Sequence, residues 1–107
     1  MKKKILFFTG SRADYGILKP LIKEISKKKY ASVELAAAGQ HFSPSFGNTY
    51  KHIFKDKIKI DHRSRVNLKK TNLKDIIHYL SKSLVDYFKI LNKANPSLII
   101  ILGDRYE

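Results

Sequence analysis

The sequence predicts an α/β fold built on a parallel, Rossmann-like sheet. Short apolar segments at 3–9, 32–38 and 98–102 have the composition of buried strands, and segments with helical periodicity lie between them. Strands that alternate with helices are joined by right-handed βαβ connections and form parallel sheets. A doubly wound sheet also requires a helix after the last strand, so we expect this chain to supply only part of a domain.

The first part of the chain is predicted to form a strand, a loop and a helix, followed by a second strand. A loop over 10–15 follows the strand at 3–9. Apolar residues then recur at helical spacing to about Lys28. Pro20 is expected in the first turn of this helix, where its missing N–H does little harm. The second strand is predicted at 32–38.

The middle of the chain is less regular. A loop rich in Ser, Pro and Gly is expected over 40–47, followed by a short helix over 48–55. The side chains expected to face inward from this helix are Tyr50, Ile53 and Phe54. Alternation over 57–61 predicts a strand exposed on one side, and the polar, basic segment 62–71 predicts a connection.

A long helix and a strand are predicted near the C-terminus. Asn72 can cap the start of the helix, and Asn95-Pro96 would end it. One apolar stripe runs along this helix, formed by Leu73, Ile76, Ile77, Leu80, Leu84, Phe88 and Leu91. The strand at 98–102 follows and leads into a polar loop at 103–107.

Length and composition describe one small globular domain. The chain has 107 residues, of which 43% are hydrophobic and 29% charged. It contains no cysteine, which excludes disulfides and thiolate metal sites. No apolar run is long enough to span a bilayer, and no signal-peptide pattern follows the N-terminal lysines. We therefore expect a cytoplasmic protein with no membrane partner.

The net charge of +13 raises an alternative from a different class, a small basic nucleic-acid-binding module. Such a module would cluster its lysines on one face and expose aromatic side chains. The lysines are instead spread along the chain, and the aromatic residues fall at positions typical of a core. We therefore expect no nucleic-acid partner.

Two loops carry residues suited to chemistry. Ligands of open parallel sheets bind beyond the carboxyl ends of the strands, where the loops at 10–16 and 103–107 are expected. In the first loop, Gly10 permits a tight turn, the next helix offers N–H groups, and Arg12 can bind a phosphate. The alternative is that Asp14 caps the helix and pairs with Arg12. The loop has neither a dinucleotide fingerprint nor a Walker pattern.

Asp104 follows a run of aliphatic residues at the end of a predicted strand. Poor solvation there would raise the pKa of a carboxyl group into a range useful for proton transfer. Arg105 could bind a diphosphate, or could keep Asp104 ionised. The alternative is a structural aspartate that fixes the turn through backbone N–H groups.

The four histidines show no metal-ligand spacing, so no metal site is predicted. Only His41 falls in a loop on the ligand side, where it could hydrogen-bond a sugar or order the loop. His52 and His78 lie on predicted helices and are expected to face solvent.

Three segments together resemble a known family. Residues 9–22 (TGSRADYGILKPLI), 39–53 (GQHFSPSFGNTYKHI) and 102–107 (LGDRYE) resemble, in order and rough spacing, the hydrolysing UDP-N-acetylglucosamine 2-epimerases of bacterial sialic acid synthesis. Relatives in legionaminic acid synthesis are similar. The pair Ala13-Asp14 favours the hydrolysing branch, because the non-hydrolysing relatives usually have Pro-Glu there.

The resemblance implies a two-domain, glycosyltransferase-B-like fold. Residues 1–107 would be the N-terminal half of its Rossmann-like first domain, and the second domain would be absent. The implied reaction eliminates UDP from UDP-N-acetylglucosamine and adds water to the glycal, giving N-acetylmannosamine and UDP. It requires a base and stabilisation of the leaving diphosphate, but no cofactor and no metal. The full-length form is expected to be a homo-oligomer, and this fragment alone to be inactive.

The resemblance also assigns roles to individual residues. Asp104 matches a carboxylate implicated in acid–base catalysis, and Arg12 and Arg105 match arginines that contact the UDP portion. Gly16 matches a position of the nucleotide site where some members have serine, so only backbone contact is left there. His41 lies in a family-like loop as a possible sugar-side residue.

The identity of the sugar stays open, because the loops that would contact it lie mostly outside this chain. UDP-N,N'-diacetylbacillosamine is the alternative substrate for a 2-epimerase. A glycosyltransferase of the same architecture is a further alternative, which the combination of the Arg12 and Asp104 loops disfavours.

Overall fold

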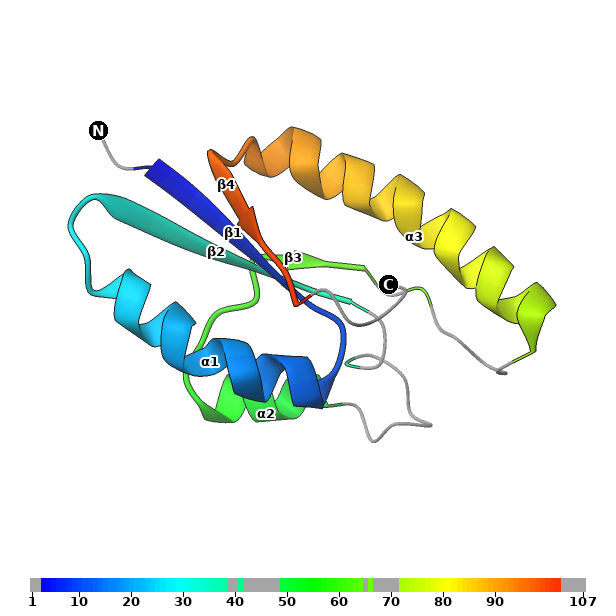
Figure 1. The fold of residues 1–107 in the computed structure, drawn as a ribbon, viewed down its shortest axis with the longest axis horizontal. Helices are drawn as coiled ribbons and strands as arrows, with labels where there is room; N and C mark the ends of the chain where they lie inside the picture. The colour runs from blue at the N-terminus through cyan, green and yellow to red at the C-terminus, as the bar shows by residue number, and fades with distance from the viewer. Residues whose placement is uncertain (1–2, 39–40, 42–48, 65, 67–71, 103–107) are drawn as a thin grey trace.

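The computed structural model describes residues 3–38, 41, 49–64, 66 and 72–102, except for the side chain of Arg12. The predicted alternation of strands and helices is confirmed (Figure 1). In chain order the elements are β1 (Lys3–Thr9), α1 (Arg12–Ser26), β2 (Ala31–Ala37), α2 (Tyr50–Lys55), β3 (His62–Arg63), α3 (Leu73–Ala94) and β4 (Leu98–Ile100).

The strands form one parallel sheet in the order β3-β2-β1-β4, which confirms the predicted α/β, Rossmann-like fold. β1 is central, and its Phe7 lies opposite Leu35 of β2 and Ile100 of β4. Because the strands are parallel, their carboxyl ends meet at one edge of the sheet. We call this edge, marked by Thr9, Ala37 and Ile100, the carboxyl rim.

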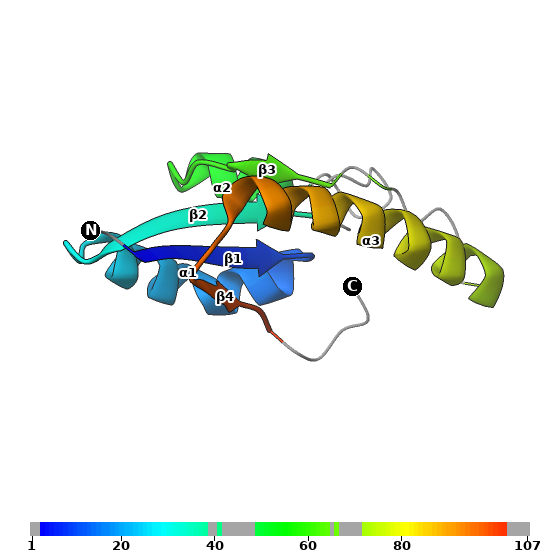
Figure 2. The same ribbon diagram turned by 90° about the horizontal axis from the view of Figure 1, so that it is seen from above.

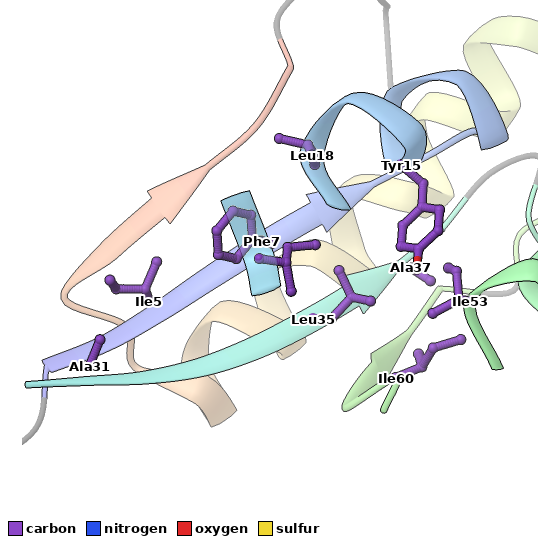
Figure 3. Packing of buried hydrophobic residues seen from close by; sticks show 10 residues of the cluster. Ile5, Phe7, Tyr15, Leu18, Ala31, Leu35, Ala37, Ile53 and Ile60 are labelled. Atoms are coloured by element: carbon purple, nitrogen blue, oxygen red, sulfur yellow. The ribbon is translucent and has the colours of Figure 1, made fainter. Parts of the chain in front are cut away.

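Helices cover both faces of the sheet, with α1 and α2 on one face and α3 on the other (Figures 1 and 2). Successive strand residues point to opposite faces, so each strand contributes to two cores. The core beneath α1 and α2 is the larger, and includes Phe7, Leu18, Ile22, Leu35 and Ile53 (Figure 3). The core beneath α3 contains Leu6, Ala36, Ile90 and Ala94.

Helix α1 begins earlier than predicted. It starts at Arg12, inside the segment expected to be a loop, because Ser11 and Asp14 form a capping box in which each side chain accepts from the other residue's backbone N–H. The helix ends at Ser26. Pro20 consequently lies inside the helix, and the prediction that it occupies the first turn is wrong.

The strand predicted at 57–61 does not form. Lys57 has a left-handed backbone with φ 60°, and the N–H of Ile58 donates to the carbonyl of Ile53 at 3.3 Å. Residues 57 and 58 therefore belong to the turn that ends α2. Pairing with β2 begins only at His62, inside the segment predicted as a connection. The alternating pattern therefore belongs to a turn and an extended approach to β3.

Helix α2 buries fewer side chains than predicted. Ile53 is fully buried as expected, but Phe54 is 46% exposed, so the prediction that it faces inward is wrong. Its ring contacts Tyr50 edge-on, with centroids 5.6 Å apart, and the Arg63 guanidinium lies 5.6 Å from its centroid. A helix of only six residues presents one narrow face to the core, and Ile53 occupies that face.

Helix α3 has the predicted caps, Asn72 and Asn95, but its predicted apolar stripe faces the sheet only in part. Leu91 packs against the core beneath α3, whereas most of the stripe is exposed. The residues that it buries are Tyr79, Ser83, Ile90 and Ala94. Its first turns extend beyond the carboxyl rim, where no strand lies beneath them (Figures 1 and 2). We call the exposed set Leu73, Ile77, Leu84, Val85 and Phe88 the outer apolar face.

Strand β4 is shorter than the predicted 98–102, and it forms one edge of the sheet. Leu98 and Ile99 on this strand are exposed, as is Ile101 just beyond it. Apolar surface is thus open to solvent on both α3 and β4. No helix in the described part of the chain is long and apolar enough to cross a lipid bilayer.

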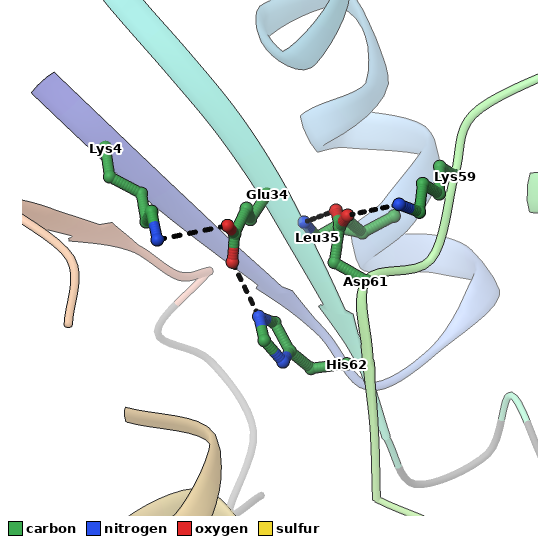
Figure 4. A network of polar contacts seen from close by, with 6 residues as sticks. All are labelled: Lys4, Glu34, Leu35, Lys59, Asp61 and His62. Carbon is green, nitrogen blue, oxygen red and sulfur yellow. Dashed lines mark hydrogen bonds and ion pairs between the residues drawn. The ribbon is translucent and has the colours of Figure 1, made fainter. Parts of the chain in front are cut away.

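Polar side chains tie the three neighbouring strands together (Figure 4). Glu34 of β2 accepts from Lys4 Nζ at 3.2 Å and contacts His62 Nε2 at 2.6 Å. Burial alone would raise the pKa of Glu34, but the hydrogen bonds to His62 and Lys4 together lower it. Asp61 accepts from the N–H of Leu35 at 2.9 Å. These contacts fix the register of the short strand β3 against β2.

Replacing Lys57 with glycine is expected to raise the free energy of unfolding by about 0.5–1 kcal/mol, because glycine adopts a left-handed backbone without steric cost. Lys57 is exposed, so no packing is lost. Urea unfolding would measure the change. Lys29→Gly is the matched control, because Lys29 is also exposed in a turn and lacks a positive φ. A gain in Lys29→Gly as large as that in Lys57→Gly would contradict the explanation.

Candidate functional site

The carboxyl rim brings together the ends of the strands that precede both candidate loops. Thr9 ends β1 and leads through Gly10 into α1, while Ile101 and Leu102 follow β4, which pairs with β1. Asp104 and Arg105 lie outside the described residues, so their roles stay predictions.

A cavity of about 260 Å³ opens at the rim between β1, β4 and α3. Thr9, Gly10 and Asp14 line it on the side of β1 and α1. The rest of its lining is mostly apolar and includes Tyr87 and Leu91 of α3. The rim therefore offers a concave surface with polar groups at one end, which is the usual arrangement of a small-molecule site.

Asp14 caps α1, which is one of the two interpretations that the sequence left open. Its Oδ2 accepts from the N–H groups of Gly10 and Ser11 at 3.0 and 3.1 Å, and its Oδ1 hydrogen-bonds Thr9. The side chain is only 7% exposed. The suggested pairing with Arg12 concerns a side chain outside the described part of the chain.

These contacts limit which donors of the first loop an anion could use. The N–H groups of Gly10 and Ser11 are not free for a phosphate, because the Asp14 carboxylate already occupies them. An anion at this helix end must use other donors, of which the Arg12 side chain is the strongest candidate on chemical grounds. Arg12 itself is the first residue of α1.

His41 is enclosed within the protein, with no exposed surface. Its Nε2 lies 2.8 Å from Thr9 Oγ1, and its Nδ1 lies 2.9 Å from Thr49 Oγ1. Burial lowers the pKa of His41 to about 4, although the Asp14 charge opposes this shift, so the ring is neutral at pH 7. Both ring nitrogens are occupied by protein groups, which favours the loop-ordering interpretation over a sugar contact.

The remaining predicted residues lie on helix surfaces. Gly16 is exposed in the second turn of α1, and a Cβ placed there would meet no atom within 4 Å. The serine found at this position in some members of the resembled family would therefore fit. His52 and His78 face solvent, as predicted. Within the described ranges, no three His, Asp or Glu side chains lie close enough to hold a metal ion.

Thr9 and Thr49 are members of the site that sequence reasoning missed. Thr9 is 1% exposed and Thr49 is 8% exposed, and both bind His41. The sequence did contain a signal for the contacts between Ser11 and Asp14, because Ser11-x-x-Asp14 has the spacing of a capping box. No local pattern connects Thr9 with His41, because only the fold brings them together.

Comparisons with known proteins agree with this geometry. Residues 23–107 match the family model described as UDP-N-acetylglucosamine 2-epimerase. The chain is 33% identical over 105 residues to "Polysialic acid biosynthesis protein P7" of Escherichia coli, covering 98% of this chain and 27% of that protein. It is 33% identical over 106 residues to "GDP/UDP-N,N'-diacetylbacillosamine 2-epimerase (hydrolyzing)" of Campylobacter jejuni, covering 99% of this chain and 27% of that protein.

Solved structures share the fold. A crystal structure of UDP-N-acetylglucosamine 2-epimerase superposes with a TM-score of 0.79 at 19% identity, covering 98% of this chain and 28% of that one. The Neisseria meningitidis UDP-GlcNAc 2-epimerase, solved with UDP-GlcNAc bound, gives a TM-score of 0.68 at 22% identity, covering 95% of this chain and 26% of that one. The chain thus spans about a quarter of the length of these proteins.

Proposed function

Because this chain belongs to the UDP-N-acetylglucosamine 2-epimerase family, we propose that it is the N-terminal part of a hydrolysing UDP-N-acetylglucosamine 2-epimerase. The complete enzyme would convert UDP-N-acetylglucosamine and water to N-acetylmannosamine and UDP, for the synthesis of sialic acid or a related nonulosonic acid. The match of the family model over residues 23–107 carries this proposal. The relative from Legionella pneumophila, 26% identical over 107 residues, also has "hydrolyzing" in its name.

The alternative substrate is UDP-N,N'-diacetylbacillosamine. It is favoured by the printed names of the Campylobacter jejuni and Legionella pneumophila relatives, which are 33% and 26% identical to this chain. Both substrates share the UDP group and the carbon at which epimerisation occurs. The same rim would therefore serve either one, and the sugar would be distinguished by residues outside this chain.

We assign the residues of the rim as follows. Asp104 is the acid–base residue, while Arg12, Arg105 and the exposed surface at Gly16 contact the UDP portion. This assignment is supported by the pairing of β1 with β4, which directs the chain segments leading to Arg12 and Asp104 toward the same edge. His41 is enclosed, so it supports the loop rather than binding the sugar.

The arrangement of the complete enzyme is also a proposal. Residues 1–107 would form the N-terminal half of the first of two glycosyltransferase-B-like domains, with the UDP-sugar held between the domains. A homo-oligomer in the cytoplasm is also part of this proposal. The outer apolar face of α3, which contains Leu84 and Phe88, would gain stability when another part of the complete protein or a second subunit covers it. The elimination and hydration steps use protein groups and water, so no cofactor is assigned.

The chain alone is expected to bind UDP weakly and to release none from UDP-N-acetylglucosamine, because one wall of the cleft is missing. Saturation-transfer NMR with UDP would detect binding, and a coupled assay would detect released UDP. Arg12→Ala should abolish the UDP signal. Lys23→Ala is the matched control, because Lys23 is a basic residue at the other end of α1.

Three outcomes would contradict these expectations. Equal UDP binding by the wild-type chain and Arg12→Ala would remove Arg12 from the nucleotide site. Binding of a single-stranded oligonucleotide in preference to UDP, with a steep loss at higher salt, would favour the nucleic-acid module instead. Robust UDP release by the chain would overturn the expectation that the fragment is inactive.

A further inference from the structure

We propose that His41 is a positioning residue of the carboxyl rim, held as its Nε2–H tautomer between Thr9 and Thr49. Through Thr9 it supports the Asp14 carboxylate and thereby the turn that leads into α1. The relevance of this support to UDP binding rests on the proposed function. Which group donates and which accepts in each of these hydrogen bonds does not depend on any ligand.

The direction of each hydrogen bond can be derived starting from Asp14, because a carboxylate only accepts hydrogen bonds. Its Oδ2 accepts from the N–H groups of Gly10 and Ser11. Its Oδ1 contacts the Thr9 hydroxyl, whose single hydrogen could also reach the Ser11 carbonyl at 3.2 Å. A carboxylate is the stronger acceptor, so the hydrogen of Thr9 points to Asp14.

The tautomer of His41 follows from this direction. With its hydrogen given to Asp14, Thr9 Oγ1 can only accept from His41 Nε2, 2.8 Å away. Because the buried ring is neutral, Nδ1 carries no hydrogen and accepts from the Thr49 hydroxyl at 2.9 Å. The other tautomer would require the Thr9 hydrogen for His41, and would leave the oxygens of Thr9 and Asp14 facing each other without a hydrogen.

The position of His41 shows which parts of the fold this series of hydrogen bonds connects. A backbone hydrogen bond of 2.9 Å from the N–H of Ala38 to the carbonyl of Thr9 joins the ends of β1 and β2. Beyond it, His41 connects the end of β1 with Thr49, the N-cap residue of α2. The enclosed ring thus joins the starts of two helices at the rim without itself reaching solvent.

Side-chain NMR of the ¹⁵N-labelled chain tests the tautomer directly. Long-range ¹H–¹⁵N correlations distinguish Nε2–H, Nδ1–H and doubly protonated imidazoles, and His41→Phe identifies the His41 signal by its disappearance. We expect the Nε2–H form, persisting from pH 7 down to about pH 5, because burial lowers the pKa of His41 to about 4. An Nδ1–H form, or a doubly protonated His41 ring at about pH 6, would overturn the proposal.

Amide hydrogen exchange tests the positioning role. In His41→Phe, exchange at Gly10 and Ser11 should become about five- to tenfold faster, the effect of one lost hydrogen bond. His41→Gln keeps an N–H donor toward Thr9 and should restore part of the protection. Equal acceleration at Ile90 in α3 would show a merely global loss and overturn the role. Failure of UDP to bind, with these results intact, would count against the proposed function alone.

Discussion

Replacing Asp14 with alanine is expected to lower the free energy of unfolding by about 2–4 kcal/mol. Asp14 accepts hydrogen bonds from two backbone N–H groups and hydrogen-bonds Thr9, and it is only 7% exposed. Alanine would leave these donors without an acceptor and largely away from water. Since domains of this size are stable by only about 5–15 kcal/mol, the loss would be a large fraction of the total. Urea unfolding followed by circular dichroism would measure it.

Asp75→Ala provides a matched control for this prediction. Asp75 occupies the same position at the start of α3 and forms the corresponding contacts with Asn72, but there the contacts are exposed to water. Its loss should cost at most about 1 kcal/mol, because water can replace the lost partner. Equal costs for Asp14→Ala and Asp75→Ala would contradict the view that burial makes the Asp14 contacts strong.

Lowering the pH from 6.5 to 4 is expected to remove roughly 3 kcal/mol of stability through His41 alone. The pKa of His41 is lowered by burial from 6.5 to about 4 in the folded protein. Between pH 6.5 and pH 4, His41 is protonated in the unfolded chain but neutral in the folded chain. The contribution is therefore complete above pH 6.5 and is lost as the pH falls toward 4. Urea unfolding at a series of pH values would record this slope.

His41→Phe should flatten the slope in this window, whatever it does to the absolute stability. His78→Gln is the matched control, because it replaces a histidine that is exposed on α3 and leaves the His41 site intact. The pKa of Glu34 is also lowered, by its hydrogen bonds to His62 and Lys4. Its contribution is lost at still lower pH, below the ordinary value of a carboxyl group, so it separates from that of His41. An unchanged slope in His41→Phe would contradict the assignment.

The parallel sheet could be predicted because β1 and β4 carry strong local signals. Both come from continuous apolar segments, which are typical of strands in parallel sheets, although β4 forms an edge of the sheet and is largely exposed. β3 gave no such signal, because it contains only two residues and is held by Glu34 and Asp61 through contacts between distant parts of the chain. The prediction of a strand at 57–61 was also wrong, because the local alternating pattern does not show where pairing with β2 begins.

Helical periodicity in α3 predicted the helix but not the side on which it packs. The stripe containing Leu84 and Phe88 has the correct spacing, yet both residues are exposed while Tyr79 and Ile90 are buried. Periodicity identifies an apolar face, whereas the direction in which the helix crosses the sheet decides which residues the strands cover. That direction depends on tertiary packing, which no local segment encodes.

The candidate site was predictable in its position but only partly in its chemistry. The glycine that follows β1, with the arginine and aspartate after it, indicated a candidate functional loop, and the structure places the start of this loop at the expected edge of the sheet. The direction of the Asp14 side chain was decided by the capping geometry of Ser11. The role of His41 depends on Thr9 and Thr49, which lie far from each other in the sequence and meet only after folding.

The outer apolar face of α3 has a consequence in the cell. A helix that presents Leu84 and Phe88 to water is a binding site for chaperones and a signal for proteolysis until another protein surface covers it. Polar residues at Leu84 and Phe88 would reduce this exposed apolar surface and make the chain easier to keep in solution for ligand titration.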